Sequence, residues 1–165
     1  MKRFSQIVFL CTTNTFLSPV AEGIYRKNST DWMPQAISRG LVVLFEEPIN
    51  PKCNVLLTQS GFHISGHGQS RQLMPEDLKE GSLILTMTLS EKVKLIEEFS
   101  YEENVYTIGE FVGSDTDILE PVEEEAYKAC ADELITRVNL AIQKIEQLYW
   151  EENEEEDIQD DSIRQ

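Results

Sequence analysis

Residues 7–10, with the sequence IVFL, form a continuous run of apolar residues rich in β-branched and aromatic side chains. A run of this kind, without polar alternation, is typical of a strand that is buried on both faces. It ends at Cys11, and after a polar loop Ser18 and Pro19 precede a helical pattern that continues to about Asn28. Serine before a helix and proline at its first position are common start signals, so we expect Ser18 to be the N-cap. This part of the chain therefore predicts a strand, a loop and a helix.

The same alternation continues along the chain. We expect further strands at residues 37–44, 83–87 and 104–107, and further helices at residues 50–61, 90–98 and 123–150. In the last helix, apolar residues recur at helical spacing and form one stripe that would pack on a sheet. Parallel strands require helical crossovers, so this order predicts an α/β fold with three layers around a parallel sheet.

The length of 165 residues and the distribution of charge indicate one domain with a terminal extension. We expect residues 1–150 to form the domain, and residues 151–165, with eight acidic residues and one arginine, to form a poorly ordered tail. The whole chain has 14 basic and 30 acidic residues and a net charge of −16. This charge repels nucleic acid phosphates and anionic membrane surfaces, so neither is an expected partner.

The cysteines and histidines indicate a cytoplasmic protein without a metal or cofactor. Cys11, Cys53 and Cys130 are an odd number of widely separated thiols, which fits a reducing compartment and no disulfide or zinc site. No export signal and no apolar stretch of about 20 residues is present. His63 and His67 have a spacing that could bind a metal on a helix, but the intervening and following glycines break that helix. No second pair of ligands stands nearby, so we expect no metal.

The loop of residues 11–18 is a candidate functional site. In open α/β sheets, ligands bind beyond the carboxyl ends of the strands. A thiol beside successive backbone N–H groups and a helix N-terminus lies where anions are stabilised, and these surroundings lower its pKa because they favour the thiolate. Cys11 is therefore a candidate nucleophile. The alternative is a buried cysteine that packs as a small apolar side chain.

Residues 8–23, with the sequence VFLCTTNTFLSPVAEG, resemble the opening of the low-molecular-weight protein tyrosine phosphatases, which include bacterial arginine phosphatases and thioredoxin-coupled arsenate reductases. The resemblance continues through SRG at 38–40, SGH at 65–67, SRQL at 70–73, EDL at 76–78 and LILTMT at 83–88, and it reaches Glu120 and Pro121. It implies a four-stranded parallel sheet flanked by helices. It also implies hydrolysis of phosphotyrosine or phosphoarginine through a cysteinyl-phosphate on Cys11, with a phosphorylated protein or a small phosphate or other oxyanion as the partner.

In this family a cysteine is followed, after five residues, by an arginine and then serine or threonine. The thiolate attacks phosphorus, the loop amides and the arginine hold the phosphate oxygens, and an aspartate before proline protonates the leaving group. The resemblance assigns Glu120 as the acid and a phosphate-binding loop made of Thr12, Thr13, Asn14, Thr15, Phe16, Leu17 and Ser18.

Several of these residues depart from the family pattern. Leu17 stands in place of the arginine, and leucine offers neither a charge nor a hydrogen-bond donor. Glu120 stands in place of the aspartate, and Phe16 in place of the second cysteine of many members. Thr13 stands where glycine is common, so we expect strain in the turn. Thr15 matches the threonine typical of the arginine phosphatases.

The rate contributions of the replaced residues favour a strongly impaired phosphatase. An arginine on a transferring phosphoryl group is worth about 10³ to 10⁵ in rate, and general acid catalysis about 10² to 10⁴. The rate contribution of the arginine is therefore lost unless another cation, such as Arg39 or Arg71, takes its place. The alternative is a catalytically inactive pseudo-phosphatase that binds an anion or a partner protein. Arsenate reduction is disfavoured because residues 73–120 contain no cysteine, and dinucleotide binding because residues 12–18 contain no glycine.

Overall fold

The computed structural model describes residues 4–62 and 68–164. Strands and helices alternate along this part of the chain. The strands are β1 (Gln6–Cys11), β2 (Ala36–Gly40), β3 (Ser82–Thr86) and β4 (Val105–Thr107). The helices are α1 (Leu17–Asn28), α2 (Pro51–Gln59), α3 (Leu89–Phe99), α4 (Ile108–Val112) and α5 (Ala126–Ile163), with a 3-10 helix η1 (Pro75–Asp77).

The four strands form one parallel sheet in the order β2-β1-β3-β4. β1 is central and all six of its residues are buried. The register pairs Cys11 with Gly40 on one side and Leu10 with Thr86 on the other, so three strands end at the same edge of the sheet. The predicted three-layer α/β fold with a four-stranded parallel sheet is confirmed.

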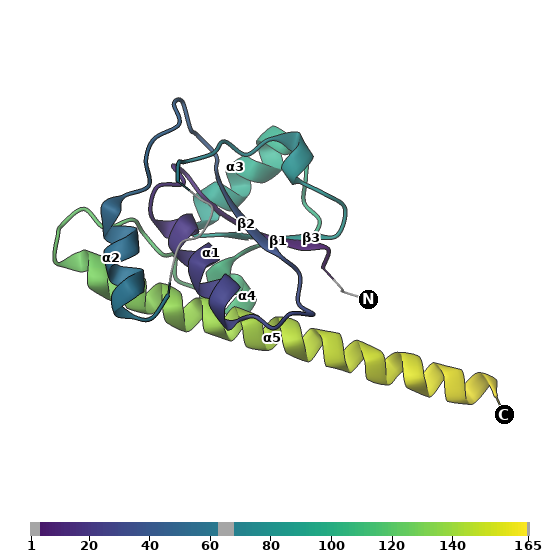
Figure 1. The fold of residues 1–165 in the computed structure, drawn as a ribbon. Helices are drawn as coiled ribbons and strands as arrows, with labels where there is room; N and C mark the ends of the chain where they lie inside the picture. Colours follow the sequence, from purple (N-terminus) through teal and green to yellow (C-terminus); the bar gives the residue numbers. More distant parts are fainter. Residues whose placement is uncertain (1–3, 63–67, 165) are drawn as a thin grey trace.

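The side chains of β1 contribute to two apolar cores, because successive residues of a strand point to opposite faces of a sheet. Ile7 and Phe9 face the larger core, which α1, α2, α4 and α5 cover. Val8 and Leu10 face the smaller core, which Leu95 of α3 covers. Figure 1 shows α3 on one face of the sheet and α1, α4 and α5 on the other. Burial on both faces explains why the strand sequence shows no polar alternation.

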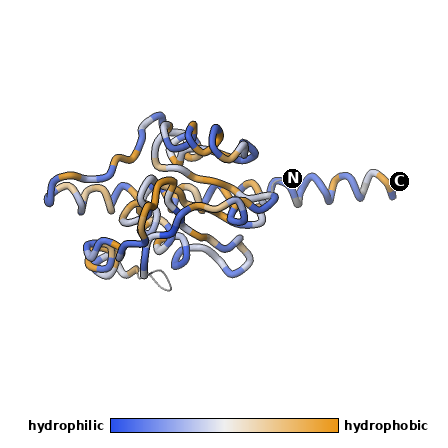
Figure 2. Tube along the Cα trace, turned by 90° about the horizontal axis from the view of Figure 1, so that it is seen from above, coloured by the Kyte–Doolittle hydropathy of each residue, from blue (hydrophilic) through white to orange (hydrophobic). Residues whose placement is uncertain are grey.

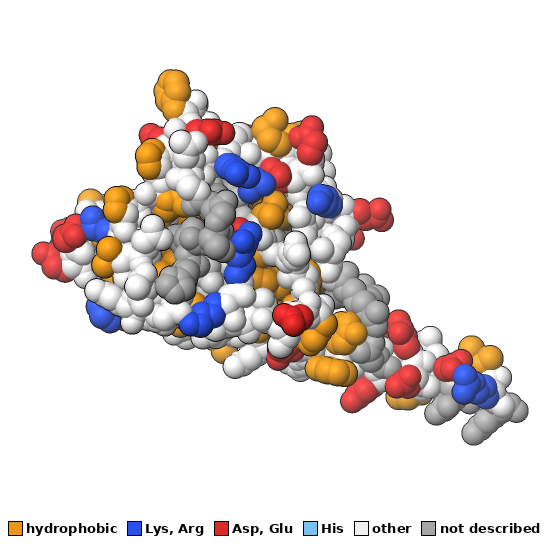
Figure 3. Space-filling model, viewed as in Figure 1, with side chains coloured by type: hydrophobic (Ala, Val, Ile, Leu, Met, Phe, Trp, Pro, Cys, Tyr) orange, Lys and Arg blue, Asp and Glu red, His pale blue; other side chains and the backbone are white. Residues whose placement is uncertain are grey.

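Helix α5 extends beyond the point where we expected it to end. Its packed part ends at an aromatic cluster, in which the ring of Trp32 lies 4.4 Å from that of Tyr149 and 6.2 Å from that of Trp150. The helix then continues to Ile163 and projects from the domain (Figure 1). The projecting end is hydrophilic for most of its length, and acidic side chains are distributed along it (Figures 2 and 3).

The helical conformation of residues 151–163 differs from the poorly ordered tail expected from the sequence. Glutamate favours the helix, and a preformed helix adds residues without the cost of a new nucleus. A second difference is that β2 ends at Gly40 rather than at residue 44. The chain then turns toward the end of β1, where the backbone N–H groups of Leu41 and Val42 bond to the carbonyls of Cys11 and Thr12.

Within residues 4–62 and 68–164, no helix combines the length and the apolar character required to cross a membrane.

Candidate active site

The loop between β1 and α1 lies at the carboxyl end of the central strand. One residue, Asn14, has a left-handed backbone conformation, with φ of 57°. Asparagine tolerates this conformation better than most residues do. The expected strain at Thr13 is wrong, because the left-handed position of the turn falls on its neighbour. Gly40 allows β2 to approach the loop: a Cβ atom there would lie 3.0 Å from the Thr12 carbonyl oxygen and 3.0 Å from Asn14 Cβ.

Cys11 is almost fully buried, with 3% of its surface exposed. Its Sγ lies 2.9 Å from Ser18 Oγ, and the backbone N–H of Asn14 donates to it over 3.2 Å. Burial raises the pKa of the thiol to about 11, although the Ser18 hydroxyl and the backbone N–H groups of Ser18 and Asn14 lower it. The expected lowering of the Cys11 pKa is therefore wrong in sign. The predicted donors are present, but loss of hydration outweighs them.

Ser18 lies within the first turn of α1 and is not its N-cap. The helix begins at Leu17, and Phe16 is the N-cap, without a capping side chain. The Ser18 hydroxyl instead accepts from Asn14 Nδ2 over 2.8 Å and can donate to the carbonyl of Arg39 over 3.3 Å. Asn14 Nδ2 also donates to Ser38 Oγ over 3.2 Å. These buried contacts hold the loop against the end of β2.

Several other backbone N–H groups of the loop have no hydrogen-bond acceptor within the described part of the chain. Within residues 4–62 and 68–164, those of Thr13, Thr15, Phe16 and Leu17 bond to no acceptor. The first N–H groups of a helix have no partner inside the helix, and together they stabilise an anion. Thr13 Oγ1 and Thr15 Oγ1 lie 2.9 Å apart.

Leu17 and Phe16 belong to the larger apolar core rather than to a polar site. Leu17 is 4% exposed. The Phe16 ring packs edge-on against Tyr127 with 4.9 Å between the ring centroids. The end of the loop is therefore anchored by apolar contacts, and residue 17 contributes no charge.

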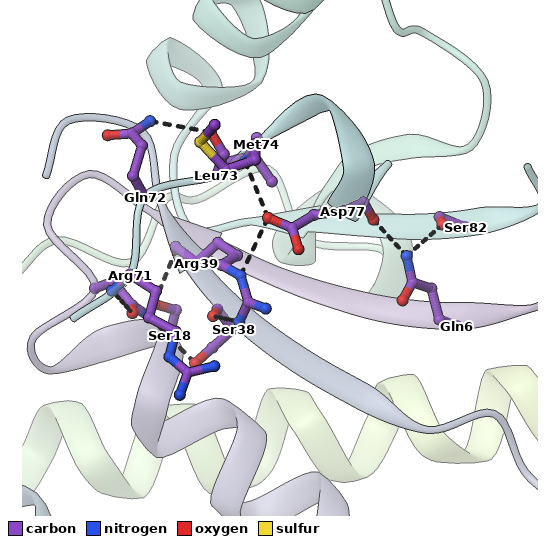
Figure 4. Close-up of polar contacts among 11 residues, drawn as sticks. Gln6, Ser18, Ser38, Arg39, Arg71, Gln72, Leu73, Met74, Asp77 and Ser82 are labelled. Carbon is purple, nitrogen blue, oxygen red and sulfur yellow. Dashed lines mark hydrogen bonds and ion pairs between the residues drawn. The ribbon is translucent and has the colours of Figure 1, made fainter. Parts of the chain in front are cut away.

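Arg39 and Arg71, the two candidate substitutes for the missing arginine, have different surroundings. The Arg39 Nε atom donates to Asp77 Oδ2 over 3.1 Å, and Nη1 donates to the Ser38 carbonyl over 2.8 Å (Figure 4). Its guanidinium is thus held by groups outside the loop. The Arg71 backbone N–H donates to Asn14 Oδ1 over 2.9 Å. Its side chain is exposed and forms no ion pair within the described part of the chain.

Glu120 follows Ile118, whose backbone N–H bonds to the Met87 carbonyl at the end of β3. The Glu120 side chain is exposed, and partial desolvation together with the negative charge of Glu91 raises the pKa of its carboxyl above its usual value. Burial raises the pKa of Cys53, and the negative charge of Glu120 adds a smaller contribution. The Cys53 thiol donates to the Thr15 carbonyl over 3.4 Å. Glu120 therefore interacts with groups that contact the loop.

Glu91 is a charged neighbour of the loop that the sequence did not reveal. Its Oε2 accepts a hydrogen bond from Thr12 Oγ1 over 2.8 Å. The sequence signal at this position is the capping box of α3, in which Glu91 and Thr88 bond to each other's backbone N–H groups. The sequence identifies Cys53 only as a free thiol, and its contact with Thr15 depends on the tertiary fold.

The described residues contain no group of three or more His, Cys, Asp or Glu side chains that could hold a metal ion. The pair His63 and His67 lies outside the described residues.

The comparisons with known proteins agree on one family. Residues 6–150 match the model of the family described as low molecular weight phosphotyrosine protein phosphatase. The low molecular weight protein-tyrosine-phosphatase PtpB of Staphylococcus haemolyticus is 31% identical over 116 residues, which cover 70% of this chain and 80% of that protein. The protein-arginine-phosphatase of Geobacillus stearothermophilus is 28% identical over 145 residues, which cover 86% and 96%.

A solved structure, the low molecular weight protein tyrosine phosphatase from T. tengcongensis, resembles this chain with a TM-score of 0.77 and 35% sequence identity, over 84% of this chain and 98% of that one. The family match thus spans the whole sheet and the packed part of α5. Together with the Cys11 loop at the end of β1, these findings show that the chain belongs to the low molecular weight phosphotyrosine protein phosphatase family.

Proposed function

We propose that the loop of residues 11–18 binds a phosphate-type oxyanion, and that the chain hydrolyses phosphomonoesters only very slowly. One observation carries this proposal: the Asn14 N–H donates to Cys11 Sγ, and the N–H groups of residues 13 and 15–17 have no acceptor within the described residues, whereas residue 17 is a buried leucine. Donors without a cation can bind an oxyanion weakly. They stabilise the charge that develops in the transition state less than an arginine would.

The proposed reaction is that of the family, with each part weakened. The Cys11 thiolate would attack phosphorus, forming the S–P bond and breaking the P–O bond of a phosphomonoester or the P–N bond of phosphoarginine. The Glu120 carboxyl would give its proton to the leaving oxygen or nitrogen. Water would then hydrolyse the cysteinyl-phosphate. The raised pKa of Cys11 supports a slow first step, because the thiolate is a small fraction at neutral pH.

A second candidate is an active phosphatase in which Arg71 supplies the missing cation. The observation in its favour is the backbone contact of Arg71 with Asn14, which brings to the loop an exposed arginine that forms no ion pair with the described residues. Arginine can bind two phosphate oxygens at once. In this case Arg71 would replace the lost charge from a different element of the fold.

The substrate class we propose is a phosphorylated protein side chain. The relatives include a protein-tyrosine-phosphatase and a protein-arginine-phosphatase, so both phosphotyrosine and phosphoarginine are candidates. Thr15, which matches the threonine of the arginine phosphatases, supports phosphoarginine. All three cysteines are free thiols, which supports the cytosol as the compartment.

The test is turnover of p-nitrophenyl phosphate by the full chain, beside Cys11→Ser and Arg71→Ala. Thermal stability is also measured with and without sulfate, which binds wherever the loop accepts a tetrahedral oxyanion. We expect slow turnover that Cys11→Ser abolishes, and a rise in Tm with sulfate. Fast turnover that Arg71→Ala reduces by 100-fold or more, on the order expected for a phosphate-binding arginine, would favour the second candidate. No stabilisation by sulfate and no turnover would contradict both.

A non-catalytic role remains the alternative within the same proposal. A pseudo-phosphatase would bind the phosphoprotein or a partner without releasing phosphate. Sulfate stabilisation combined with turnover that is unchanged in Cys11→Ser would favour this role.

A further inference from the structure

Glu91 lies on the first turn of α3 and points toward the loop from the opposite side of the sheet edge. It is buried, and both of its carboxylate oxygens accept hydrogen bonds. Oε2 accepts from Thr12 Oγ1 over 2.8 Å, and Oε1 accepts from the Thr88 backbone N–H over 2.9 Å. Thr12 directly follows Cys11, so one side chain connects this carboxylate to the proposed oxyanion site.

The other groups around Glu91 do not neutralise it. Cys11 and Glu120 both feel its negative charge, which raises the pKa of each. Asp117 adds a further carboxylate, since its Oδ1 accepts from the backbone N–H at the start of α3 over 3.1 Å. Cys53, on α2, interacts with both Cys11 and Glu120 and has its own pKa raised to about 12, mainly by burial.

Three cations on the neighbouring elements pair with other carboxylates. Lys92, next to Glu91 in the sequence, pairs with Glu110 at 2.8 Å. Lys52 on α2 pairs with Glu124 at 3.0 Å, and Arg39 on β2 pairs with Asp77. Arg71, the exposed arginine, contacts the loop through its backbone. The carboxylate of Glu91 is therefore opposed to the binding of a dianion.

We propose that Glu91 controls the oxyanion affinity of the Cys11 loop: its ionised carboxylate opposes both the bound anion and the Cys11 thiolate, and the loop binds oxyanions more tightly when residue 91 is neutral. This inference rests on the proposed function of the loop. It makes Glu91 a positioning residue with an inhibitory charge, in addition to its structural role in the capping box of α3.

Glutamine separates the charge of Glu91 from its structural role. Its side chain can still accept from the Thr88 N–H, and glutamine also forms capping boxes. Its amide group can donate to Thr12 Oγ1, because a hydroxyl is both donor and acceptor. Glu91→Gln should therefore keep the helix start and the loop contact while it removes the charge.

Burial also raises the pKa of Glu91 above that of an ordinary glutamate. On acidification, Glu91 consequently becomes neutral at a higher pH than an exposed glutamate does. In the parent chain, sulfate affinity should increase as the pH falls through this pKa. Glu91→Gln should bind sulfate more tightly and without that step. Sulfate is a suitable probe because it remains a dianion over the range tested.

The experiment measures two properties of the full chain, Glu91→Gln and the control Glu98→Gln. Glu98 lies on the same helix, is exposed, and pairs with Lys94 at 3.8 Å. The first property is the sulfate dissociation constant between pH 5 and 8, obtained from sulfate-dependent Tm. The second is the pH dependence of iodoacetamide labelling at Cys11, read by mass spectrometry of the Cys11 peptide.

We expect Glu91→Gln to bind sulfate about tenfold more tightly at pH 7.5. The midpoint of Cys11 labelling should fall by about one pH unit, which is the low end of the pKa shift that a neighbouring charge causes. Glu98→Gln should behave as the parent. If sulfate binds the parent but Glu91→Gln has the same affinity, pH profile and labelling midpoint, the inference is overturned and the proposed function stands. If none of the chains binds sulfate, the proposed function fails. In that case the labelling midpoint still tests the inference, and an equal Cys11 midpoint in the parent and Glu91→Gln overturns it.

Discussion

Replacing Leu17 with arginine tests whether the chain differs from an efficient phosphatase mainly at this position. The Asn14 turn, the Ser18 contacts and the available N–H groups are already present. The left-handed position falls on Asn14, so Thr13 does not require replacement. Leu17→Arg should therefore increase kcat/KM, and Glu120→Asp should add to the increase because it restores the shorter acid.

The structure also predicts a loss of stability from this substitution. Leu17 is 4% exposed and packs in the larger core. A fully buried leucine contributes about 1.5–3 kcal/mol, and the arginine stem recovers part of this contact. We expect a net destabilisation of about 1–3 kcal/mol. For a chain of this size, that corresponds to a decrease in Tm of roughly 2–12 °C.

The chemical gain can be estimated from the Cys11 pKa. Its value of about 11 should fall by about 1–3 units beside a new positive charge, which raises the thiolate fraction at neutral pH about 10- to 1000-fold. Part of the roughly 10³- to 10⁵-fold contribution of a phosphate-binding arginine should be recovered as well. The two effects overlap, because the same charge stabilises the thiolate and the phosphate.

The assay compares kcat/KM for p-nitrophenyl phosphate and the pH dependence of Cys11 labelling in the parent, Leu17→Arg, and Leu17→Arg with Glu120→Asp. Leu17→Met is the control for core packing without charge, and Leu17→Arg with Cys11→Ser is the control for nucleophilic attack. An unchanged kcat/KM in a folded Leu17→Arg variant, with a lowered labelling midpoint, would refute the reasoning about the arginine. Robust turnover by the parent would show that another cation already fills this role.

Three further predictions concern stability. Asn14→Ala should lower the free energy of unfolding in urea by about 2–4 kcal/mol, because it leaves buried partners unpaired and places alanine at a positive φ; Asn14→Gly, which leaves the same partners unpaired but avoids the strain at positive φ, should be less destabilised. Deletion of residues 152–165 should leave Tm within about 2 °C, since the projecting helix buries little apolar area, and a larger decrease would show that it docks. Stability should fall as the pH rises from about 9 through the raised thiol pKa values, about 11 for Cys11 and about 12 for Cys53. The folded state disfavours the thiolates, so Cys53→Ala should make this decline less steep in urea titrations at pH 8 and 10.5, and an equal slope would contradict the assignment.

Much of the fold follows from local sequence patterns. The apolar runs at β1 and β3 predict strands buried on both faces, and the helical spacing of the segment after residue 123 predicts α5. The position of the loop follows as well, because a parallel sheet places the residue after β1 at a binding edge. The absence of an arginine at position 17 is likewise visible without coordinates.

The state of the site required the tertiary structure. The pKa of Cys11 depends on burial by α1, β2 and the neighbouring loops, and this burial outweighs the donors that the sequence suggested. Arg39 is held by Asp77, 38 residues away in the sequence. Glu91 contacts Thr12 across 79 residues, although locally it reads only as part of a helix start. Sequence patterns report the periodicity and chemistry of neighbouring residues, whereas hydration and charge in a site depend on elements that only folding brings together.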